Sequence, residues 1–490
     1  MRARTGRVLV AALLVTTAAT SVAQARSAPT SQAAVTTPVA QDPARAGTWY
    51  CPVVGADEDQ TVLSVAAVGD AATQVVVARY GRSGPLWGEA VTIQPGGVHE
   101  TALAPGDAGP LAVRWSGGPA TAAVRLQGPD GVASLACAQG PRQQWLLPGL
   151  DTASGSVSLL HLHNPYAGDA VVQVSFATAD GRVERLLGDA VLVPAGSAAQ
   201  LDIGELEPER LDLGVLVSVR AGRVLAAGEV RMEPPEGLSG PSGRTLLAAV
   251  PAPALWWGFA VARQGDGADS WLSLLNPGEA DAAVEVRVSD PLPGGGALDD
   301  EVTVPAGGVL RVPLAEVSSA PEFGVQVESV NGVGVAAALV TDLRGGAGQE
   351  VSATSGAAAG ATHWSLVGAG TAVQDAVAVV HNPGSETATV TVHAPGAPPE
   401  WRGVQLAANS RVALPGSAIP DGLAPPALAL EVTADVPVLA EVRTTTAEPL
   451  RAWTVGAVPA SAWAGPPQRP AVVHDPRLGG RSTGLPEVQP

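Results

Sequence analysis

Aromatic side chains are scarce in this chain of 490 residues: they make up 3% of it, although apolar residues make up 46%. Hydrophobic cores must therefore be packed mainly from valine, leucine and alanine. The apolar content argues against wholesale disorder. Because the chain is too long for a single core, its length predicts three or four domains.

Positive charge is also in short supply. The chain has 28 basic residues, every one of them arginine, against 46 acidic residues. Removal of an N-terminal leader containing Arg2, Arg4 and Arg7 changes the balance to 25 − 46 = −21. A surface of this sign repels phosphate groups wherever salt does not screen it. We therefore expect neither nucleic acid nor an anionic membrane surface as a partner.

Sequence signatures of catalysis are missing as well. There is no phosphate-binding Walker loop, no HExxH zinc motif, no GxSxG nucleophile elbow and no GxGxxG sequence that opens a helix. The sequence therefore predicts no catalytic residue, no cofactor and no enzymatic activity. A glycan-active enzyme is kept as a distant third alternative, because the paired carboxylates of glycoside hydrolysis have no fixed spacing in sequence.

Long apolar runs are absent after the N-terminus. Residues 1–25 combine the three arginines with an apolar stretch, Val8 to Thr20, and end in Ala23-Gln24-Ala25, a small-x-small pattern that signal peptidase cleaves. We predict a signal peptide. The alternative is an uncleaved anchor, which would be the only membrane contact, although a spanning helix needs about 20 apolar residues. Either way the protein is expected outside the cytoplasm, secreted or in the cell envelope.

Two segments without periodicity flank the remaining chain. Residues 26–46 are rich in Ala, Pro, Ser and Thr, which predicts a flexible linker. Residues 466–490 contain six prolines and no alternation, which predicts a disordered tail.

Between these segments the chain repeats. Short segments centred on tryptophan recur at intervals of 96 to 111 residues, and each internal one is followed about 19 residues later by Asn-Pro and then by a valine-rich strand ending in a turn such as Val193-Pro194-Ala195-Gly196. Landmarks in a constant order indicate tandem modules, which we place at residues 47–142, 143–253, 254–361 and 362–465. The repeated positions are Trp49, Trp145, Trp256, Trp364, Trp463, Asn164, Pro165, Asn276, Pro277, Asn382 and Pro383.

These repeated residues have structural interpretations. Asn caps turns with its side chain and Pro cannot donate to a sheet ladder, so the pair ends a strand. Trp supplies the largest apolar area of any residue. One Trp at a fixed place in each module predicts the plug of a core or of a junction between modules, with an aromatic ligand platform as the alternative.

Alternation with a period of two predicts the fold. Runs such as Ala283 to Val288 and Gly324 to Val330 alternate apolar with polar or small residues, which is typical of half-buried strands. Turn residues separate about seven such runs in each module. We therefore predict an all-β protein of four tandem immunoglobulin-like β-sandwich modules. A β-propeller is the alternative, because short, evenly spaced strands also suit four-stranded blades.

The two cysteines, Cys51 and Cys137, lie at the two ends of the first module. In an exported protein such a pair predicts a disulfide, here between the first and last strands of the module. A zinc site is the weaker interpretation, because no Cys-His ligand set of the usual spacing accompanies the pair.

Several residues are candidates for binding. An exposed Trp on a sandwich can stack on a sugar ring, although local packing is the alternative. His161 and His163 share one face of a strand and are weak metal candidates, but His163, like His381, directly precedes Asn-Pro and so belongs to the scaffold. The acidic cluster Asp57-Glu58-Asp59 could bind calcium or form a solvated face. The Trp residues considered as ligand contacts are Trp87, Trp115, Trp271 and Trp401.

The order Trp, valine or leucine strand, Asn-Pro-Gly, valine strand and Val-Pro-Ala-Gly resembles a repeat of secreted bacterial proteins, in particular an actinobacterial secreted-protein family of unknown function. The resemblance covers about residues 47–465. In that repeat the Trp segment commonly continues as aromatic-Ala-Glu-Gly, whereas here Trp364 is followed by Ser365-Leu366-Val367-Gly368 without the acidic residue. It implies a sandwich fold and an envelope or extracellular location, and it brings no catalytic residue.

Two classes of function follow. The first is an exported, non-catalytic structural or adhesive module array of the cell envelope. The second is a carbohydrate- or protein-binding module set that uses exposed Trp. In both, the expected partner is a cell-envelope glycan or protein whose identity the sequence does not reveal.

Overall fold

The structure, a computed structural model, describes residues 46–459 apart from 82–83, 106–108, 184–189, 235–239, 266, 290–295, 298–300, 346–347, 369–375, 421–426, 448–449 and 457. The chain divides into two compact units, Met1–Asp42 and Pro43–Pro490, and every described residue belongs to the second. The predicted signal peptide, the predicted tail, Trp463 and all of the predicted linker except Ala46 lie outside the described residues. Within the described part, no helix is long and apolar enough to cross a membrane.

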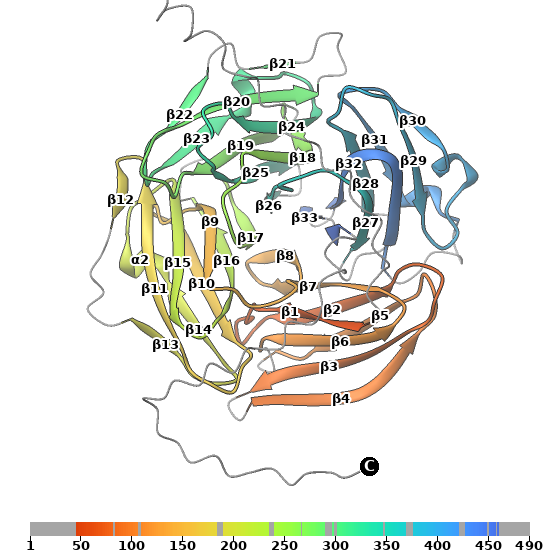
Figure 1. Cartoon of the computed structure of the whole chain (residues 1–490), viewed down its shortest axis with the longest axis horizontal. Coiled ribbons are helices and arrows are strands. Elements are labelled where there is room, and N and C mark those ends of the chain that lie inside the picture. Colours follow the sequence, from red (N-terminus) through yellow and green to blue (C-terminus); the bar gives the residue numbers. More distant parts are fainter. Residues whose placement is uncertain are drawn as a thin grey trace, which may run out of the picture. The chain divides into compact units, whose positions relative to one another are not determined.

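Module 1 consists of two antiparallel sheets (Figure 1). The first contains, in spatial order, β1 (Ala46–Cys51), β6 (Leu111–Gly117), β3 (Thr73–Gly81) and β4 (Gly84–Ile93). The second contains β5 (Val98–Leu103), β2 (Gln60–Ala67), β7 (Ala120–Gly128) and β8 (Gly131–Ala136).

Module 2 repeats this plan. Its first sheet contains β12 (Gly181–Val183), β11 (Ala170–Thr178), β15 (Leu213–Ala221) and β9 (Gln144–Leu150), with β13 (Val191–Val193) also paired to β11. Its second sheet contains β14 (Ser197–Asp202), β10 (Ser156–Asn164), β16 (Leu225–Met232) and β17 (Gly243–Ala248). A single helical turn, α2 (Ile203–Leu206), follows β14.

Module 3 has the same arrangement. Its first sheet contains β18 (Trp256–Arg263), β24 (Glu322–Ser329), β20 (Ala282–Ser289) and β21 (Gly296–Ala297), with β22 (Val302–Val304) also paired to β20. Its second sheet contains β23 (Val309–Pro313), β19 (Ala268–Leu275), β25 (Ala336–Gly345) and β26 (Gly348–Ser355). The 3-10 turn η1 (Leu314–Glu316) follows β23.

In module 4 one long strand, β32 (Ala429–Ala447), belongs to both sheets. With it in the first sheet are β30 (Val404–Leu406), β29 (Ala388–His393), β27 (Ala361–Val367) and β34 (Val458–Pro459). With it in the second are β31 (Ser410–Pro415), β28 (Ala376–Asn382) and β33 (Leu450–Gly456). Two 3-10 turns are η3 (Pro399–Trp401) and η4 (Gly416–Ala418).

The prediction of an all-β protein is confirmed. In each module the two sheets pack on one core, so a module is a sandwich rather than the single four-stranded blade of a propeller. The strand order nevertheless differs from that of an immunoglobulin domain, where the first strand pairs with the second. In module 1, β1 pairs with β6.

The recurrent Trp closes each core and is held by one repeated hydrogen bond. The indole Nε1 of Trp49, Trp145 and Trp364 donates to a main-chain oxygen, each over 2.8 Å. The acceptors are Ala120 at the start of β7, Val224 directly before β16, and Val438 in the middle of the long strand β32. In module 3 the equivalent donor is Trp257, which bonds to Val335 O over 2.6 Å. The choice of Trp256 as the repeated position was therefore wrong. Because neighbouring residues of a strand face opposite sides, Trp257 enters its own core, whereas Trp256 packs against the core of module 4.

The Asn side chain of each Asn-Pro pair holds the turn that follows it with hydrogen bonds, as predicted. Asn164 Nδ2 donates to the carbonyl oxygens of Gly168 (2.7 Å) and Val193 (3.1 Å), and its Oδ1 accepts the backbone N–H of Tyr166 (3.1 Å). Asn276 and Asn382 repeat this pattern in modules 3 and 4. One buried amide thus ties the end of the second strand to the next turn and to the valine-rich strand.

The predicted disulfide between Cys51 and Cys137 is confirmed, with an S–S distance of 2.04 Å and a sequence separation of 86 residues. It joins the end of β1 to the segment directly after β8. Both sulfurs lie in the buried core of module 1.

The four modules contact one another in cyclic order. Their final long strands, which are labelled around the middle of this unit in Figure 1, contact as β8 with β17, β17 with β26, β26 with β33 and β33 with β8. The hydrophobic cores also continue across junctions: Leu246 of module 2 belongs to the core of module 1, and Trp271 of module 3 to that of module 2. The last module therefore packs against the first, which the repeats alone did not predict.

Candidate functional site at the junction of modules 4 and 1

Three of the four junctions between modules use the residue that precedes the Asn-Pro turn. His163 stacks edge-on against Tyr80 of module 1, with ring centroids 4.3 Å apart. Leu275 and His381 cover glycines of the preceding modules: a Cβ added to Gly214 would lie 2.7 Å from Leu275, and one added to Gly324 would lie 2.8 Å from the His381 ring. At three junctions a large side chain therefore fills the space between modules.

The fourth junction has a small residue at this place. The backbone bonds Asn276 N to Gly308 O and Ala67 N to Gly97 O are equivalent, and they put Ala66 at the position of Leu275. Ala66 packs in one small cluster with Ala429 of module 4. Next to this contact lies a cavity of about 300 Å³ between the two modules.

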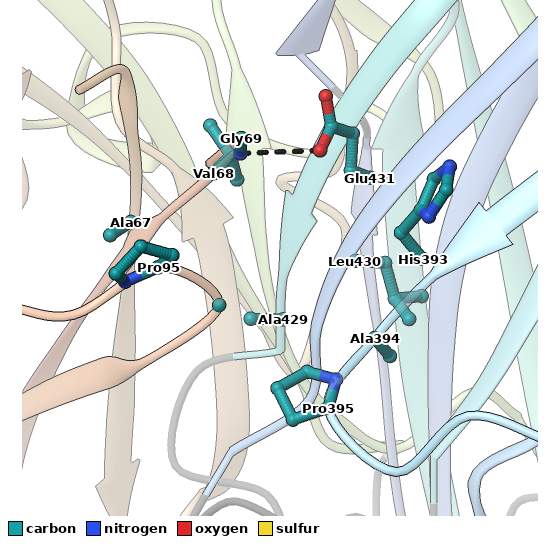
Figure 2. Close-up of a pocket in the computed structure, with 11 residues that line it drawn as sticks. Ala67, Val68, Gly69, Pro95, His393, Ala394, Pro395, Ala429, Leu430 and Glu431 are labelled. Atoms are coloured by element: carbon teal, nitrogen blue, oxygen red, sulfur yellow. Dashed lines mark hydrogen bonds between the residues drawn. The ribbon is translucent and has the colours of Figure 1, made fainter. Parts of the chain in front are cut away.

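The cavity has mostly apolar walls. Figure 2 shows Ala67, Val68 and Pro95 of module 1 on one side, and Ala394, Pro395 and Leu430 of module 4 on the other. No Trp, Tyr or Phe side chain is among its lining residues. Its polar groups come from Glu431, His393 and the backbone of Gly69.

Glu431 is the electrostatic centre of the cavity. Its Oε2 accepts the Gly69 N–H over 3.2 Å, which joins module 4 to module 1 (Figure 2), and its Oε1 lies 2.6 Å from Nε2 of His363. The hydrogen bond with His363 lowers the pKa of the Glu431 carboxyl, against the opposing effect of burial, and His393 on the neighbouring strand lowers it further. The carboxylate is therefore ionised at neutral pH, and it can accept a further hydrogen bond or bind a cation.

The chemical groups of this site are one carboxylate and two imidazoles. Two histidines flank Glu431, but within the described residues no three His, Cys, Asp or Glu side chains are placed to hold a metal ion. The lining contains no serine, threonine or cysteine that could act as a nucleophile.

The four Trp residues that the sequence suggests as ligand contacts differ in their exposure to solvent. Trp87 on the edge strand β4 is 37% exposed, and the guanidinium of Arg114 lies 3.8 Å from its ring centroid. The other three are buried: Trp115 in the core of module 1, Trp271 in that of module 2 and Trp401 in that of module 4. Of the four, Trp87 is the residue that presents a ring to solvent.

His161 and His163 do face one side of β10, but that side packs on module 1. His161 Nδ1 accepts the backbone N–H of Val54 over 3.2 Å, and its Nε2 lies 3.0 Å from Oε2 of Glu229. Burial lowers the pKa of His163 to about 4, against the hydrogen bond with Ser197 O, so this ring is neutral at pH 7. Both rings are parts of a junction.

The acidic cluster 57–59 contributes to the same junction. Asp59 is buried and binds both terminal nitrogens of Arg244 over 2.7 Å each, while Arg244 Nε bonds to Glu229 at 2.8 Å. Burial raises the pKa of Glu229, but His161, Arg244 and Arg231 outweigh it and hold the value at about 2. This ionic network spans modules 1 and 2. Glu350 of module 3 extends it by accepting the backbone N–H of Arg244 over 3.0 Å.

No sequence pattern pointed directly to Glu431, Arg244 or Glu229. None belongs to a motif, and each has a decisive partner more than 60 positions away: Gly69 for Glu431, Asp59 for Arg244 and His161 for Glu229. Glu229 and Glu441 both open a Glu-Val-Arg sequence near the end of a module. This shared tripeptide is the one sequence feature that pointed to a common role for these glutamates.

Fold and site together define an all-β protein of four mutually packed sandwich modules with a cleft between the last and the first. The chain belongs to a family of unknown function, DUF5719, whose family model matches residues 101–417. The match begins within module 1 and ends within module 4. No curated protein matches the chain.

Proposed function

We propose that the protein is an exported, non-catalytic structural or adhesive protein of the cell envelope whose four modules act as one rigid platform. The buried side chain of Arg244 carries this proposal. It joins Asp59 of module 1 to Glu229 of module 2, and its backbone N–H reaches Glu350 of module 3. Such contacts require modules held in one geometry, because breaking a buried ion pair costs about 3–5 kcal/mol.

A platform differs from a linear spacer in how it unfolds. Modules that share cores and buried ion pairs should unfold as coupled units, whereas modules on flexible joints should unfold independently. Calorimetry of the chain without residues 1–25 is expected to show one dominant transition whose calorimetric and van't Hoff enthalpies agree. Four separable transitions would contradict the platform.

The location is tested with the complete chain. Expressed with residues 1–25 in its source cells, the protein should be recovered from the medium or the envelope fraction without those residues. Recovery in the cytoplasm with residues 1–25 retained would overturn the export part of the proposal.

A binding function is the second candidate, and the exposed ring of Trp87 favours it. An aromatic ring stacked with a guanidinium on an edge strand can contact a sugar or a protein side chain. Binding of the purified protein to isolated cell envelopes should fall at least tenfold in Trp87→Ala. Leu211→Ala is the matched control, since Leu211 is an exposed apolar residue of module 2. Equal binding by both variants would exclude Trp87 from the contact.

A further inference from the structure

Three guanidinium groups converge on one carboxylate where modules 3 and 4 meet. Arg263 at the end of β18 and Glu322 at the start of β24 come from module 3, and Arg411 and Arg443 come from module 4. Arg411 Nη2 lies 3.1 Å from Glu322 Oε2, Arg443 Nη1 bonds to Oε1, and Arg263 Nε lies 3.6 Å from Oε1. All four side chains are partly buried.

This cluster has a local excess of positive charge, 3 − 1 = +2, in a chain whose net charge is −18. Burial lowers the pKa of Arg263, and the like charge of Arg443 lowers it further. The acids on the neighbouring strands have other partners: Asp342 pairs with Arg344 at 2.6 Å and Asp269 accepts from Gln264 at 3.0 Å. The cluster therefore lacks a balancing anion among its immediate neighbours.

A small cavity adjoins the cluster. Its volume is about 20 Å³, and its polar lining consists of Arg263, Arg443 and the hydroxyl-bearing residues Thr341, Ser352 and Thr454. A space of this size holds one group about as large as a water molecule. Arg263 Nε is buried and has no hydrogen-bond partner among the described residues.

We propose that this cavity binds a small monoanion of about the size of chloride, held between Arg263 of module 3 and Arg443 of module 4. Guanidinium groups only donate, and hydroxyl groups can turn their protons toward an anion. The site excludes cations by its charge and larger oxyanions by its volume. The bound anion would link two modules and strengthen their junction.

The proposal predicts an anion-specific stabilisation. In thermal unfolding at one ionic strength, replacement of sodium gluconate by sodium chloride should raise the Tm of the full chain by about 1–2 °C once chloride exceeds its dissociation constant about tenfold. Gluconate is the probe that is too large for the cavity. A Tm that depends only on ionic strength would overturn the proposal.

Two variants localise the effect. Arg263→Gln should abolish the difference between chloride and gluconate, whereas Arg287→Gln should keep it, because Arg287 is an exposed arginine of module 3 that pairs with Glu285 and Glu328. Ser352→Ala keeps every charge and should weaken the chloride dependence several-fold. If Arg263→Gln fails to fold, Ser352→Ala provides the test of the site. A chloride dependence in Ser352→Ala equal to that of the parent would count against the site.

Crystals grown in bromide give the direct measurement. An anomalous peak between Arg263 and Arg443 is expected in the parent protein, with a weaker peak in Ser352→Ala. A cavity that holds water only, or bromide bound elsewhere while this cavity stays empty of it, would refute the proposal.

Discussion

The carboxyl group of Glu441 offers a sharp test of how modules 3 and 4 pack. Glu441 lies on β32, is buried, and accepts the backbone N–H of Ala260 of module 3 through Oε1 over 3.1 Å. Its Oε2 has no hydrogen-bond partner among the described residues. Burial raises the pKa of Glu441 from 4.5 to about 7, and the backbone hydrogen bonds offset only part of that effect.

The sign of the pH dependence follows from linkage. In the unfolded chain this carboxyl loses its proton near pH 4.5, whereas in the folded protein it keeps the proton up to about pH 7. Its contribution to stability is therefore fully present below pH 4.5 and is lost as the pH rises to about 7, after which the loss is constant. At 1.36 kcal/mol for each pH unit, the interval from 4.5 to about 7 corresponds to about 3 kcal/mol.

Glu441→Gln removes this ionisation while keeping an acceptor for Ala260 N–H. Glu441 lines a cavity of about 60 Å³, which has room for a water molecule that can accept hydrogen bonds from the new amide group. We expect the variant to exceed the parent in free energy of unfolding by up to about 3 kcal/mol at pH 8 and by nothing at pH 4.5.

The assay is urea unfolding of the parent and the variant at several pH values between 4.5 and 8. Glu285→Gln serves as the matched control, because Glu285 is an exposed glutamate of module 3 and its loss should change stability by less than about 1 kcal/mol at every pH. A difference between Glu441→Gln and the parent that does not change with pH would refute the reasoning.

Two further predictions concern the first two modules. Replacing Cys51 and Cys137 by serine opens a cross-link between residues 86 positions apart and should lower the free energy of unfolding by about 4 kcal/mol, while thiol titration of the unreduced parent should find no free thiol. Reactive thiols in the parent would contradict the structure. Arg244→Ala leaves Asp59 buried without its cation and removes one of the two arginines paired with Glu229, so it should cost about 3–5 kcal/mol at pH 7, whereas Arg287→Ala should cost less than about 1 kcal/mol. Similar losses in the two arginine variants would show that the buried network does not hold modules 1 and 2 together.

Features that depend on residues close in sequence could be predicted from the sequence. Alternation in runs such as Ala283 to Val288 depends on residues two positions apart, and β20 carries that alternation between core and surface. The Asn side chains act within a few residues of the turn they cap. The two cysteines are 86 positions apart, but they are the only two in the chain and so allow a single pairing. The all-β class, the order of landmarks and the disulfide were therefore predictable.

The choice between two adjacent tryptophans was not. Trp256 and Trp257 have the same chemistry, and the repeat spacing tolerates either. The tertiary structure decides which face of β18 is turned toward the core of module 3. Trp257 lies on that face and its indole bonds to Val335 O, whereas Trp256 lies on the opposite face and packs against module 4.

Contacts between modules were decided by tertiary structure alone. Arg244 meets Asp59 across 185 positions and Arg443 meets Glu322 across 121, and neither pair belongs to a local pattern. The same holds for the cavity beside Glu431, which borders modules 4 and 1 because their junction has Ala66 where other junctions have His or Leu. Periodicity specifies which face of a strand is buried, but it carries no information about which module covers that face. That depends on how complete modules pack, and such packing sets the charge and solvent exposure of every site described above.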